Sequence, residues 1–473
     1  MTRDVVRDAV NIHASGQQSI RPFLADLEKR GAVVHIDKAV DPCFEVSAFL
    51  SVADAGPALM FDEVLGSPLR IVGNLFNGRE RIAAALGVEV SEILPRLRAA
   101  IGAPLAPAAA AAAPVQSVVV TEDPLAALPV PRFFVRELRP YITAGAIVAR
   151  DPGSGRGNLS FARLAVLDGR RALIGIAPNH HLALFARRAA ALGRELEIGV
   201  VIGAHPAIQL AACLYLGVGD DEMECAGRLL GEPVRTVRAR TVGLDVPAEA
   251  ELVLEGRIDA RRPIEEGLVS EYHGLYEDYG SGFLATFDAL TRRSDAIFQV
   301  IEPGYHREHM YLAALPIAAG LYDAVAAVAP SVRDIAVTEA GAGRTDIVVQ
   351  LSSPPPDQPR RVISAVFAAL SIAKRVTVVD DDIDPWDAVA VDWARTNRMR
   401  LERDLVLVPN ARAVRSEPME AGGTVTKVGF DATAKAGDRA EGNERALPPA
   451  EASDAARRWL AARLPAERRR WLK

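Results

Sequence analysis

Hydrophobic and polar positions in the first hundred residues alternate between a helical and an extended period. Residues 19–31 place apolar side chains at helical spacing between Ser19 and Gly31, which predicts a capped amphipathic helix. The β-branched run at 32–36 predicts a strand directly after it. Residues 103–114 are mostly alanine between prolines and predict a linker. We therefore expect an N-terminal α/β segment with a linker over residues 1–114.

Strand patterns dominate the next part of the chain, which we expect to form a domain over residues 115–305. The predicted strands are 144–150, 158–167, 172–176, 198–202 and 251–254. Two helical patterns interrupt them, at 181–193 and 221–230. A long antiparallel sheet with few helices is typical of a β-barrel-like domain.

From residue 306 to residue 473 the pattern returns to an α/β domain. Its predicted elements are a helix at 308–328, strands at 334–339 and 346–351, a helix at 360–373 and a strand at 375–379. The glycine- and charge-rich stretch 420–444 predicts a loop, and 448–473 predicts a basic amphipathic helix. The fold class that follows is α+β, with a β-rich centre flanked by α/β segments.

Composition limits the kinds of partner and the cellular location that we expect for this protein. The 473 residues carry a net charge of −6, so we expect no broad basic surface for nucleic acid or a membrane, and a small molecule as partner. The three cysteines lack metal-ligand spacing and predict free thiols in a cytoplasmic protein. The most apolar run, 311–329, contains proline, glycine and aspartate and predicts a core helix rather than a membrane span.

Asn158 and Arg163 are the first candidate site residues. They lie five positions apart in one predicted strand, which places them on opposite faces of a regular pleat. Both can serve one extended ligand only if the ligand wraps the strand or a bulge resets the pleat. A surface asparagine and a barrel arginine in a salt bridge are the alternative.

Two predicted helix starts carry further candidates. His180 and His181 begin one helix, where free backbone N–H groups favour an anion and a histidine can bind a metal that holds a phosphate. Glu222 and Glu224 begin the other, where the helix dipole alone also favours acidic residues. One carboxylate, Asn158 and a histidine would make a hard site suited to Mn²⁺ or Mg²⁺. The alternatives are an ordinary N-cap on Asn179 with solvated histidines, and first-turn acids that only suit the helix dipole.

Glu266 and Glu271 lie five residues apart around a glycine in an apolar stretch. Neither a helix nor a strand superimposes them, so a bent loop must bring them together. If both flank Arg163 in a dry pocket, one stays ionised against the guanidinium and the other can be held protonated as an acid. Ordinary loop glutamates are the alternative.

The order and spacing of these motifs resemble the UbiD-type decarboxylases, which use prenylated FMN, from Arg21 to Thr433. The resemblance implies a split β-barrel flavin-binding domain and a catalytic network of Arg163, Glu266 and Glu271. It implies Mn²⁺ (or Mg²⁺) on Asn158, His181 and Glu222, with K⁺ beside it. The cofactor-binding residues that it implies are Asn158, Ser160, Phe161, Ala162, Arg163, His180, His181 and Glu222.

The same resemblance implies reversible, non-oxidative decarboxylation of a small aromatic, heteroaromatic or α,β-unsaturated acid, with CO₂ as the other partner. It also implies a flavin prenyltransferase as cofactor supplier and a homodimer or higher homo-oligomer. Many relatives have Pro-Phe-Gly between the two glutamates, where this chain has Leu268-Val-Ser270. Together with His306, Arg307 and His309, this departure suggests a pyrrole- or furan-2-carboxylate, although these three residues could equally be core or interface groups.

Two other functions stay open from the sequence. One is an FMN-dependent flavin reductase-like oxidoreductase on a similar barrel, although hydride transfer needs no paired glutamates around an arginine. The other is a non-catalytic subunit of a multisubunit carboxylase.

Overall fold

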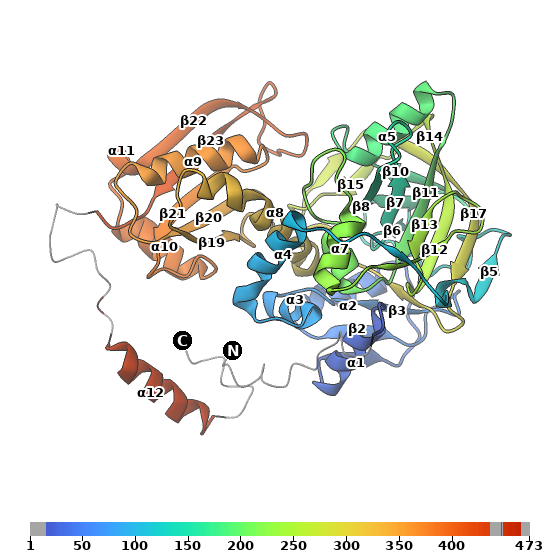
Figure 1. Cartoon of the computed structure of the whole chain (residues 1–473), viewed down its shortest axis with the longest axis horizontal. Helices are drawn as coiled ribbons and strands as arrows, with labels where there is room; N and C mark the ends of the chain where they lie inside the picture. The colour runs from blue at the N-terminus through green and yellow to red at the C-terminus, as the bar shows by residue number, and fades with distance from the viewer. Residues whose placement is uncertain (1–15, 436–445, 447, 465–473) are drawn as a thin grey trace.

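Three groups of secondary structure build the protein, for which a computed structural model describes residues 16–435, 446 and 448–464. Figure 1 shows the N-terminal elements in blue beneath a central sheet in green and yellow, and an orange C-terminal sheet on the other side of helix α8 (Arg307–Ala326). None of the helices in these ranges combines the length and the apolar composition that crossing a membrane requires.

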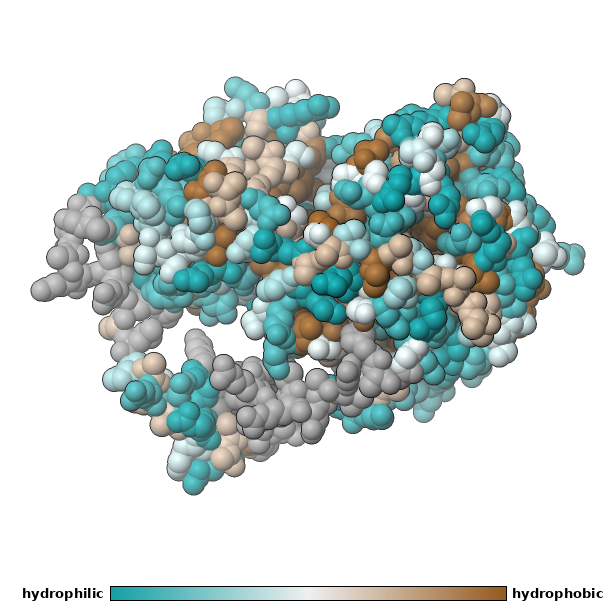
Figure 2. Space-filling model, viewed as in Figure 1, coloured by the Kyte–Doolittle hydropathy of each residue, from teal (hydrophilic) through white to brown (hydrophobic). Residues whose placement is uncertain are grey.

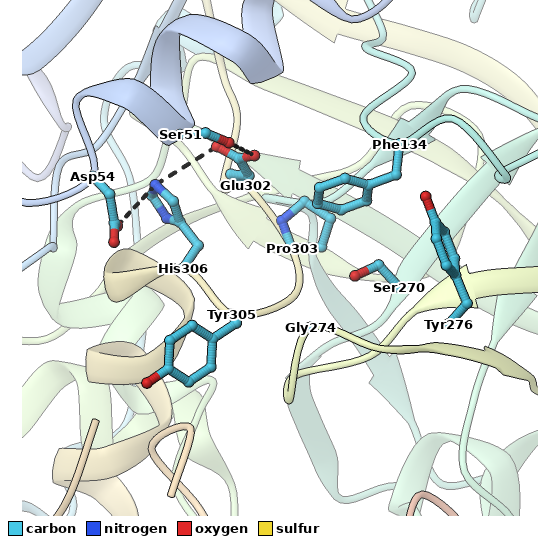
Figure 3. Close-up of a pocket in the computed structure, with 10 residues that line it drawn as sticks. All are labelled: Ser51, Asp54, Phe134, Ser270, Gly274, Tyr276, Glu302, Pro303, Tyr305 and His306. Carbon is cyan, nitrogen blue, oxygen red and sulfur yellow. Dashed lines mark hydrogen bonds and ion pairs between the residues drawn. The ribbon is translucent and has the colours of Figure 1, made fainter. Parts of the chain in front are cut away.

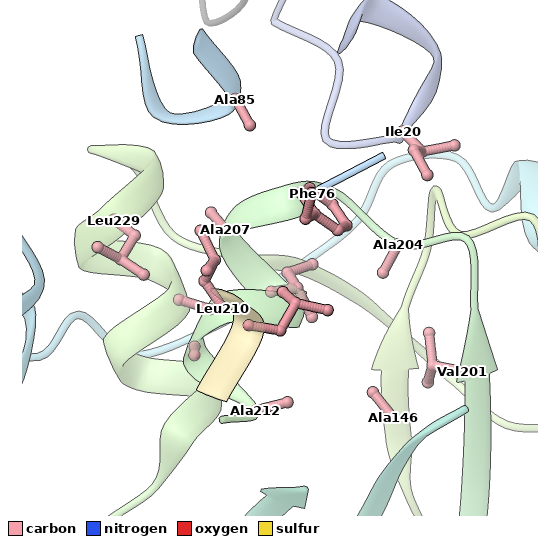
Figure 4. Packing of buried hydrophobic residues seen from close by; sticks show 14 of the residues in the cluster. Ile20, Phe76, Ala85, Ala146, Val201, Ala204, Ala207, Leu210, Ala212 and Leu229 are labelled. Atoms are coloured by element: carbon pink, nitrogen blue, oxygen red, sulfur yellow. The ribbon is translucent and has the colours of Figure 1, made fainter. Parts of the chain in front are cut away.

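The N-terminal group has a small sheet with the strand order β1-β2-β3-β18. Its elements are α1 (Arg21–Lys29), β1 (Val33–Ile36), α2 (Glu45–Val52), β2 (Ala58–Phe61), β3 (Arg70–Gly73), α3 (Arg79–Leu86), η2 (Val90–Glu92), α4 (Ile93–Gly102) and the distant β18 (Ile297–Gln299). The predicted cap on Ser19 is wrong, because Ile20 occupies the N-cap position without a side-chain hydrogen bond. Ile20 and Phe76 pack with Ala207, Leu210 and Leu229 in one buried cluster (Figure 4).

The predicted linker at 103–114 is not a free connection. Within it β4 (Ala108–Ala109) pairs in parallel with β12 (Arg235–Arg238), which in turn pairs with β13 (Asp245–Pro247). Three residues before this pairing, the backbone N–H of Leu105 donates a hydrogen bond to Glu224 O at 2.9 Å. Small side chains let the segment lie close against its neighbours, and the turn η3 (Pro114–Gln116) ends it.

The central sheet has nine strands, in the order β6-β9-β10-β17-β14-β11-β7-β8 with β5 beside β17. They are β5 (Val118–Val120), β6 (Tyr141–Ile142), β7 (Ala146–Arg150), β8 (Gly157–Phe161), β9 (Arg163–Val166), β10 (Arg171–Gly175), β11 (Leu196–Ile202), β14 (Leu252–Glu265) and β17 (Ser281–Arg292). Strand β8 is at one end of this order and β9 is second from the other end, yet only Ala162 separates them. The sheet must therefore curl until its two ends meet at Ala162. The predicted single strand 158–167 is thus two strands.

Helices cover this curled sheet where the sequence predicts them. The helices are α5 (His181–Ala191), α7 (Glu222–Leu230) and the unpredicted α6 (Pro206–Ala211). Leu182, Phe185 and Ala186 of α5 are buried against apolar residues of the sheet. A two-stranded hairpin, β15 (Leu268–Ser270) and β16 (Tyr276–Asp278), follows the end of β14.

The C-terminal sheet has the order β19-β20-β21-β23-β22. Its strands are β19 (Val332–Val337), β20 (Asp346–Leu351), β21 (Arg375–Asp380), β22 (Leu405–Arg412) and β23 (Thr424–Asp431), and its helices are α9 (Gln358–Ala369), α10 (Ala388–Asn397) and α11 (Leu401–Asp404). The predicted loop at 420–444 is wrong for β23, which lies inside the sheet, while 436–445 fall outside the described residues.

The C-terminal helix α12 (Ala450–Ala461) has no buried residue and lies apart from the other elements in Figure 1. The predicted helix runs to 473, but 465–473 fall outside the described residues. On the face of the molecule shown in Figure 2, apolar and polar residues are intermixed, with apolar groups visible where the two larger lobes meet.

Candidate functional site

Arg163 lies between Glu266 and Glu271, which the sequence predicts as its partners. Its Nε and Nη2 donate to the two carboxylate oxygens of Glu266, at 2.7 and 2.9 Å, and its Nη1 donates to Glu271 Oε1 at 3.1 Å. Glu266 is 1% exposed and Glu271 8% exposed. The structure thus brings the three residues together, with one glutamate bound by two hydrogen bonds and the other by one.

A sharp turn after β14 brings the two glutamates to the same guanidinium. Strand β14 ends at Glu265, and Gly267 then adopts a φ of 82°, which favours glycine. Glu266 lies before β15 and Glu271 after it, where the Glu271 N–H donates to Leu275 O at 3.0 Å. The bent loop that the sequence predicts is therefore a tight turn followed by a hairpin.

Gly175 makes room for the arginine–glutamate pair. It stands opposite Arg163 in the pairing of β10 with β9. A Cβ atom at this position would lie 2.7 Å from Glu266 Oε2, closer than real Cβ contacts, and 3.0 Å from Arg163 Nε, which is also tight. The sheet can carry a buried, doubly hydrogen-bonded ion pair here because β10 has no side chain at this register.

The surroundings of Arg163 keep it charged. Burial alone would lower its pKa, but the hydrogen bond and negative charge of Glu266, with Glu271, raise the pKa above the ordinary arginine value. The ring centroid of Tyr279 lies 4.3 Å from its Cζ atom. Burial raises the pKa of Tyr279 to about 12 and the pKa of the nearby Glu137 carboxyl. The guanidinium is therefore a fixed cation in a site with little water.

Asn158 and Glu222 form a second buried group at the other end of the same chain segment. Glu222 Oε2 accepts hydrogen bonds from Asn158 Nδ2 at 3.1 Å and from the Leu159 N–H at 2.8 Å. Ser160 Oγ donates to Asn158 Oδ1 at 3.1 Å. Burial raises the pKa of Glu222 to about 7, although the Leu159 N–H opposes this. A nearby cation would be the natural partner of this carboxylate.

The break at Ala162 changes the relation between Asn158 and Arg163. Asn158 belongs to β8, which pairs with β7, whereas Arg163 belongs to β9, which pairs with β10 and β6. Strict alternation along one pleated strand does not connect them. From the sequence we expect either a ligand that wraps one strand or a bulge within it, but not a change from one strand to another.

The two histidines at the start of α5 differ in their contacts. His180 is the N-cap, and its Nδ1 accepts a hydrogen bond from the Leu182 N–H at 3.3 Å. Burial, with the neighbouring His181, lowers the pKa of His180 to about 4. His181 is the first residue of the helix and is partly exposed. His180 thus has a capping contact, and His181 stays a predicted ligand.

The predicted metal ligands fit a hard divalent ion by donor type: an amide oxygen, an imidazole nitrogen and a carboxylate. The structure joins Asn158 to Glu222, while Glu224 faces Arg156 at 3.4 Å. Across the described ranges there is no group of three or more His, Cys, Asp or Glu residues that could hold a metal. The predicted set has only two such residues and depends on Asn158 as the third ligand.

His306, Arg307 and His309 do not form one polar site. His306 Nε2 lies 3.1 Å from Asp54 Oδ1 and is buried, and Arg307 pairs with Glu339 at 2.8 Å. His309 instead contacts Gly304 O and the guanidinium of Arg344. Burial, then the charge of Arg344 and, with the smallest effect, that of Arg163 lower the pKa of His309 to about 3.

A cavity of about 260 Å³ lies behind the hairpin that carries Glu271. Its lining residues are Ser51, Asp54, Phe134, Ser270, Gly274, Tyr276, Glu302, Pro303, Tyr305 and His306. Figure 3 shows the polar groups of Ser51, Asp54, Glu302 and His306 gathered on one side and the rings of Phe134 and Tyr276 on the other. The sequence singles out only His306 among them.

Glu302 is the most strongly buried acid of this cavity. Its Oε1 accepts hydrogen bonds from Ser47 and Ser51. Its Oε2 has no hydrogen-bond partner among the described residues and lies 3.6 Å from His306 Nε2. Burial raises the pKa of Glu302 to about 7. A raised acid pKa in the folded state means that the folded protein binds the extra proton, so this group's contribution to stability falls as pH rises from about 4.5 to about 7.

We therefore expect Glu302→Gln to gain stability relative to the native chain as pH rises. The difference in unfolding free energy should shift in favour of the variant by about 2–3 kcal/mol between pH 5 and pH 8. Urea unfolding of both proteins at each pH measures it, and taking the difference cancels most other titrating groups. A difference that does not change with pH would contradict the shift.

Comparison with known proteins gives consistent matches over the chain. The N-terminal, Rift-related and C-terminal domain families of 3-octaprenyl-4-hydroxybenzoate carboxy-lyase (UbiD) match residues 24–101, 107–306 and 310–432. Anhydromevalonate phosphate decarboxylase of Methanothermobacter thermautotrophicus is 32% identical over 88% of this chain and 96% of its own length.

Two solved structures are similar over most of their length. The UbiD-class enzyme HmfF from Pelotomaculum thermopropionicum, in complex with FMN, is 35% identical, with a TM-score of 0.88 over 91% of this chain and 97% of that chain. The 3,4-dihydroxybenzoic acid decarboxylase from Enterobacter cloacae is 26% identical, with a TM-score of 0.86 over 93% of this chain and 99% of that one. The α+β fold is thus shared by all three proteins.

Proposed function

The chain belongs to the UbiD family of carboxy-lyases, and from that premise we propose that it is a prenylated-FMN-dependent decarboxylase of a small unsaturated or aromatic acid. The observation that carries this proposal is the buried arrangement of Arg163 between Glu266 and Glu271. An arginine can orient a carboxylate, and a paired glutamate can supply a proton to carbon once CO₂ has left.

The hydrogen bonds give the two glutamates different roles. Both oxygens of Glu266 accept from Arg163, which fixes the orientation of the guanidinium. Glu271 uses only Oε1 on Arg163, and its Oε2 has no hydrogen bond among the described residues. We assign Glu271 Oε2 as the atom that carries the proton to the substrate carbon.

Loss of CO₂ from an sp² carbon needs an electron sink, which prenylated FMN supplies when bound and which no side chain provides. Asn158, His181 and Glu222 would hold its phosphate through Mn²⁺ or Mg²⁺, with K⁺ beside the metal. Ser160, Phe161, Ala162, Arg163 and His180 would contact the flavin itself. The burial of the Glu222 carboxylate against Asn158 supports this placement of a cation.

We propose a heteroaromatic or α,β-unsaturated acid as substrate class, with pyrrole- or furan-2-carboxylate as the first compounds to test. Of the three polar residues that suggest this choice, His306 pairs with Asp54 and Arg307 with Glu339. His309, held by Gly304 O and Arg344, is the remaining support. The solved and curated relatives act on chemically different acids according to their names, so the class is broad.

We also propose a cytoplasmic homo-oligomer, a dimer at least, with a flavin prenyltransferase as cofactor supplier. The three cysteines are free thiols, which suits a reducing compartment. Trp459 and Leu460 of α12 are 58% and 39% exposed, which supports contact with a second copy. An evolved form of the Pelotomaculum enzyme is described as dimeric.

The deciding experiment is release of CO₂ from a panel of aromatic, heteroaromatic and acrylic acids. The protein should be produced together with a flavin prenyltransferase, and its extracted cofactor identified by mass spectrometry. We expect prenylated FMN and turnover of at least one acid. Plain FMN, with reduction of flavin by a nicotinamide and no CO₂ release, would instead support a reductase.

A further inference from the structure

Arg344 is a guanidinium without an acidic partner beside the proposed catalytic network. Its hydrogen bonds run to Ala342 O at 3.5 Å and to His309 Nε2 at 3.1 Å, and its Cζ atom lies 5.0 Å from the ring centroid of Tyr272. None of the ion pairs among the described residues includes it. Tyr272 directly follows Glu271 in the chain, and after burial the charges of both Arg344 and Arg163 lower the pKa of His309, which places this cation in the neighbourhood of the network.

Three nearby arginines, by contrast, have acidic partners. Arg307 pairs with Glu339 at 2.8 Å, Arg375 pairs with Asp346 at 2.7 Å and Arg163 pairs with both catalytic glutamates. A half-buried guanidinium that has lost water without gaining an anion is unfavourable. An anion brought by a ligand would remove that cost.

His309 contributes to the same place as a neutral group. Burial, followed by the charge of Arg344, lowers the pKa of His309 to about 3. Because arginine can only donate, His309 Nε2 accepts and its proton lies on Nδ1, which donates to Gly304 O at 3.0 Å. His309 therefore orients the guanidinium without neutralising it.

The backbone holds Arg344 in place. It lies in the turn between β19 and β20, where Ala342 and Gly343 both have positive φ values, of 52° and 69°. A Cβ atom on Gly343 would lie 2.5 Å from Met310 O, so the turn packs tightly on the first turn of α8, next to His309. The position of the cation is thus built into the contact between the C-terminal sheet and α8.

We propose that Arg344, positioned by His309, binds a second anionic group of the substrate, a carboxylate or a phosphate ester. This inference rests on the proposed decarboxylase function and makes the substrate class more specific: an unsaturated acid with an anion at its far end. The leaving carboxylate would lie at Arg163 and Glu271, and the second anion at Arg344. Arg344 is then a specificity-determining residue.

The test compares ligands that differ by one anionic group. Dissociation constants are measured by calorimetry on the cofactor-loaded protein for furan-2-carboxylate against furan-2,5-dicarboxylate, and for anhydromevalonate against anhydromevalonate phosphate. We expect the doubly anionic member of at least one pair to bind roughly 10- to 100-fold more tightly. The pair that shows the preference identifies the second anion as carboxylate or phosphate.

Variants assign this preference to Arg344. Arg344→Met should remove the preference while leaving the monoanion's dissociation constant and the bound flavin unchanged, and Arg344→Lys should keep part of it. Arg361→Met, an exposed arginine of α9, is the control and should behave as the native chain does. If Arg344→Met and Arg344→Lys both unfold, the native protein's preference for the doubly anionic ligand decides whether a second anion is bound.

Three results would overturn the inference: no preference in either pair, a preference that persists in Arg344→Met, or loss of flavin from that variant, which would assign Arg344 to the cofactor. Failure of the proposed function looks different. In that case the native protein releases CO₂ from no acid, while the binding comparison can still be made.

Discussion

Replacing Glu271 by glutamine should abolish CO₂ release and leave the flavin bound. Glutamine keeps the size of the side chain and an oxygen for Arg163 Nη1, so the local structure should survive. It cannot carry a transferable proton at the Oε2 position, and removal of a general acid lowers turnover by roughly 10²–10⁴-fold. Single-turnover CO₂ release, together with the flavin absorbance of the purified variant, measures both expectations.

Glu265→Gln is the matched control for this experiment. Glu265 lies one residue before the network, is exposed and accepts a hydrogen bond from Ser281 Oγ at 2.7 Å. Its substitution should leave turnover close to the native value. A Glu271→Gln protein that turns over substrate at the native rate would refute the assignment of the proton donor.

Glu222→Ala should yield a folded protein that purifies without flavin. The substitution removes the carboxylate that accepts hydrogen bonds from Asn158 and Leu159 and that we propose as a metal ligand. Loss of a residue that only orients a metal ligand typically weakens metal binding by roughly 10- to 100-fold, so loss of a direct ligand should weaken it at least as much. Flavin absorbance and metal content per protein chain measure the loss.

Two further variants separate a lost metal from a damaged fold. Glu222→Gln keeps a hydrogen-bond acceptor without the charge and should also lose flavin. Glu224→Gln, two residues along the same helix, only weakens a contact with Arg156, so this variant should keep its flavin. Full flavin and metal content in Glu222→Gln would show that the charge of this residue is not needed.

Local sequence patterns predict much of the fold. Helices and buried strands have a regular hydrophobic period, and this period is visible in residues that are close together in the sequence. The strand over 346–351 and the helix at 222–230 are found within a residue of the prediction. Strand β14 was predicted only over 251–254, although it runs to Glu265. Its second half contains Arg257, Asp259 and Arg261, whose charges hide the strand pattern and are paired in the folded protein.

The sequence predicts which kinds of residue form the candidate site, but not how they are arranged in space. The sequence places Arg163 with Glu266 and Glu271 only through a resemblance, and the structure brings them together. Gly175 and Arg344 have no local signal, since their roles depend on neighbours that are distant along the chain. Tyr279 lies in an aromatic stretch that the sequence does show, without its contact to Arg163.

The change of strand at Ala162 also determines which distances in the site can vary. Asn158 and Arg163 are five residues apart along the backbone, a length of chain that spans at most roughly 17 Å. Motion of the flanking domains cannot alter that separation by much. Arg344 belongs to a different sheet from Glu271, so their separation follows every shift of the C-terminal domain. Cofactor retention should therefore be insensitive to domain motion, while the length of acid that fits can change with it.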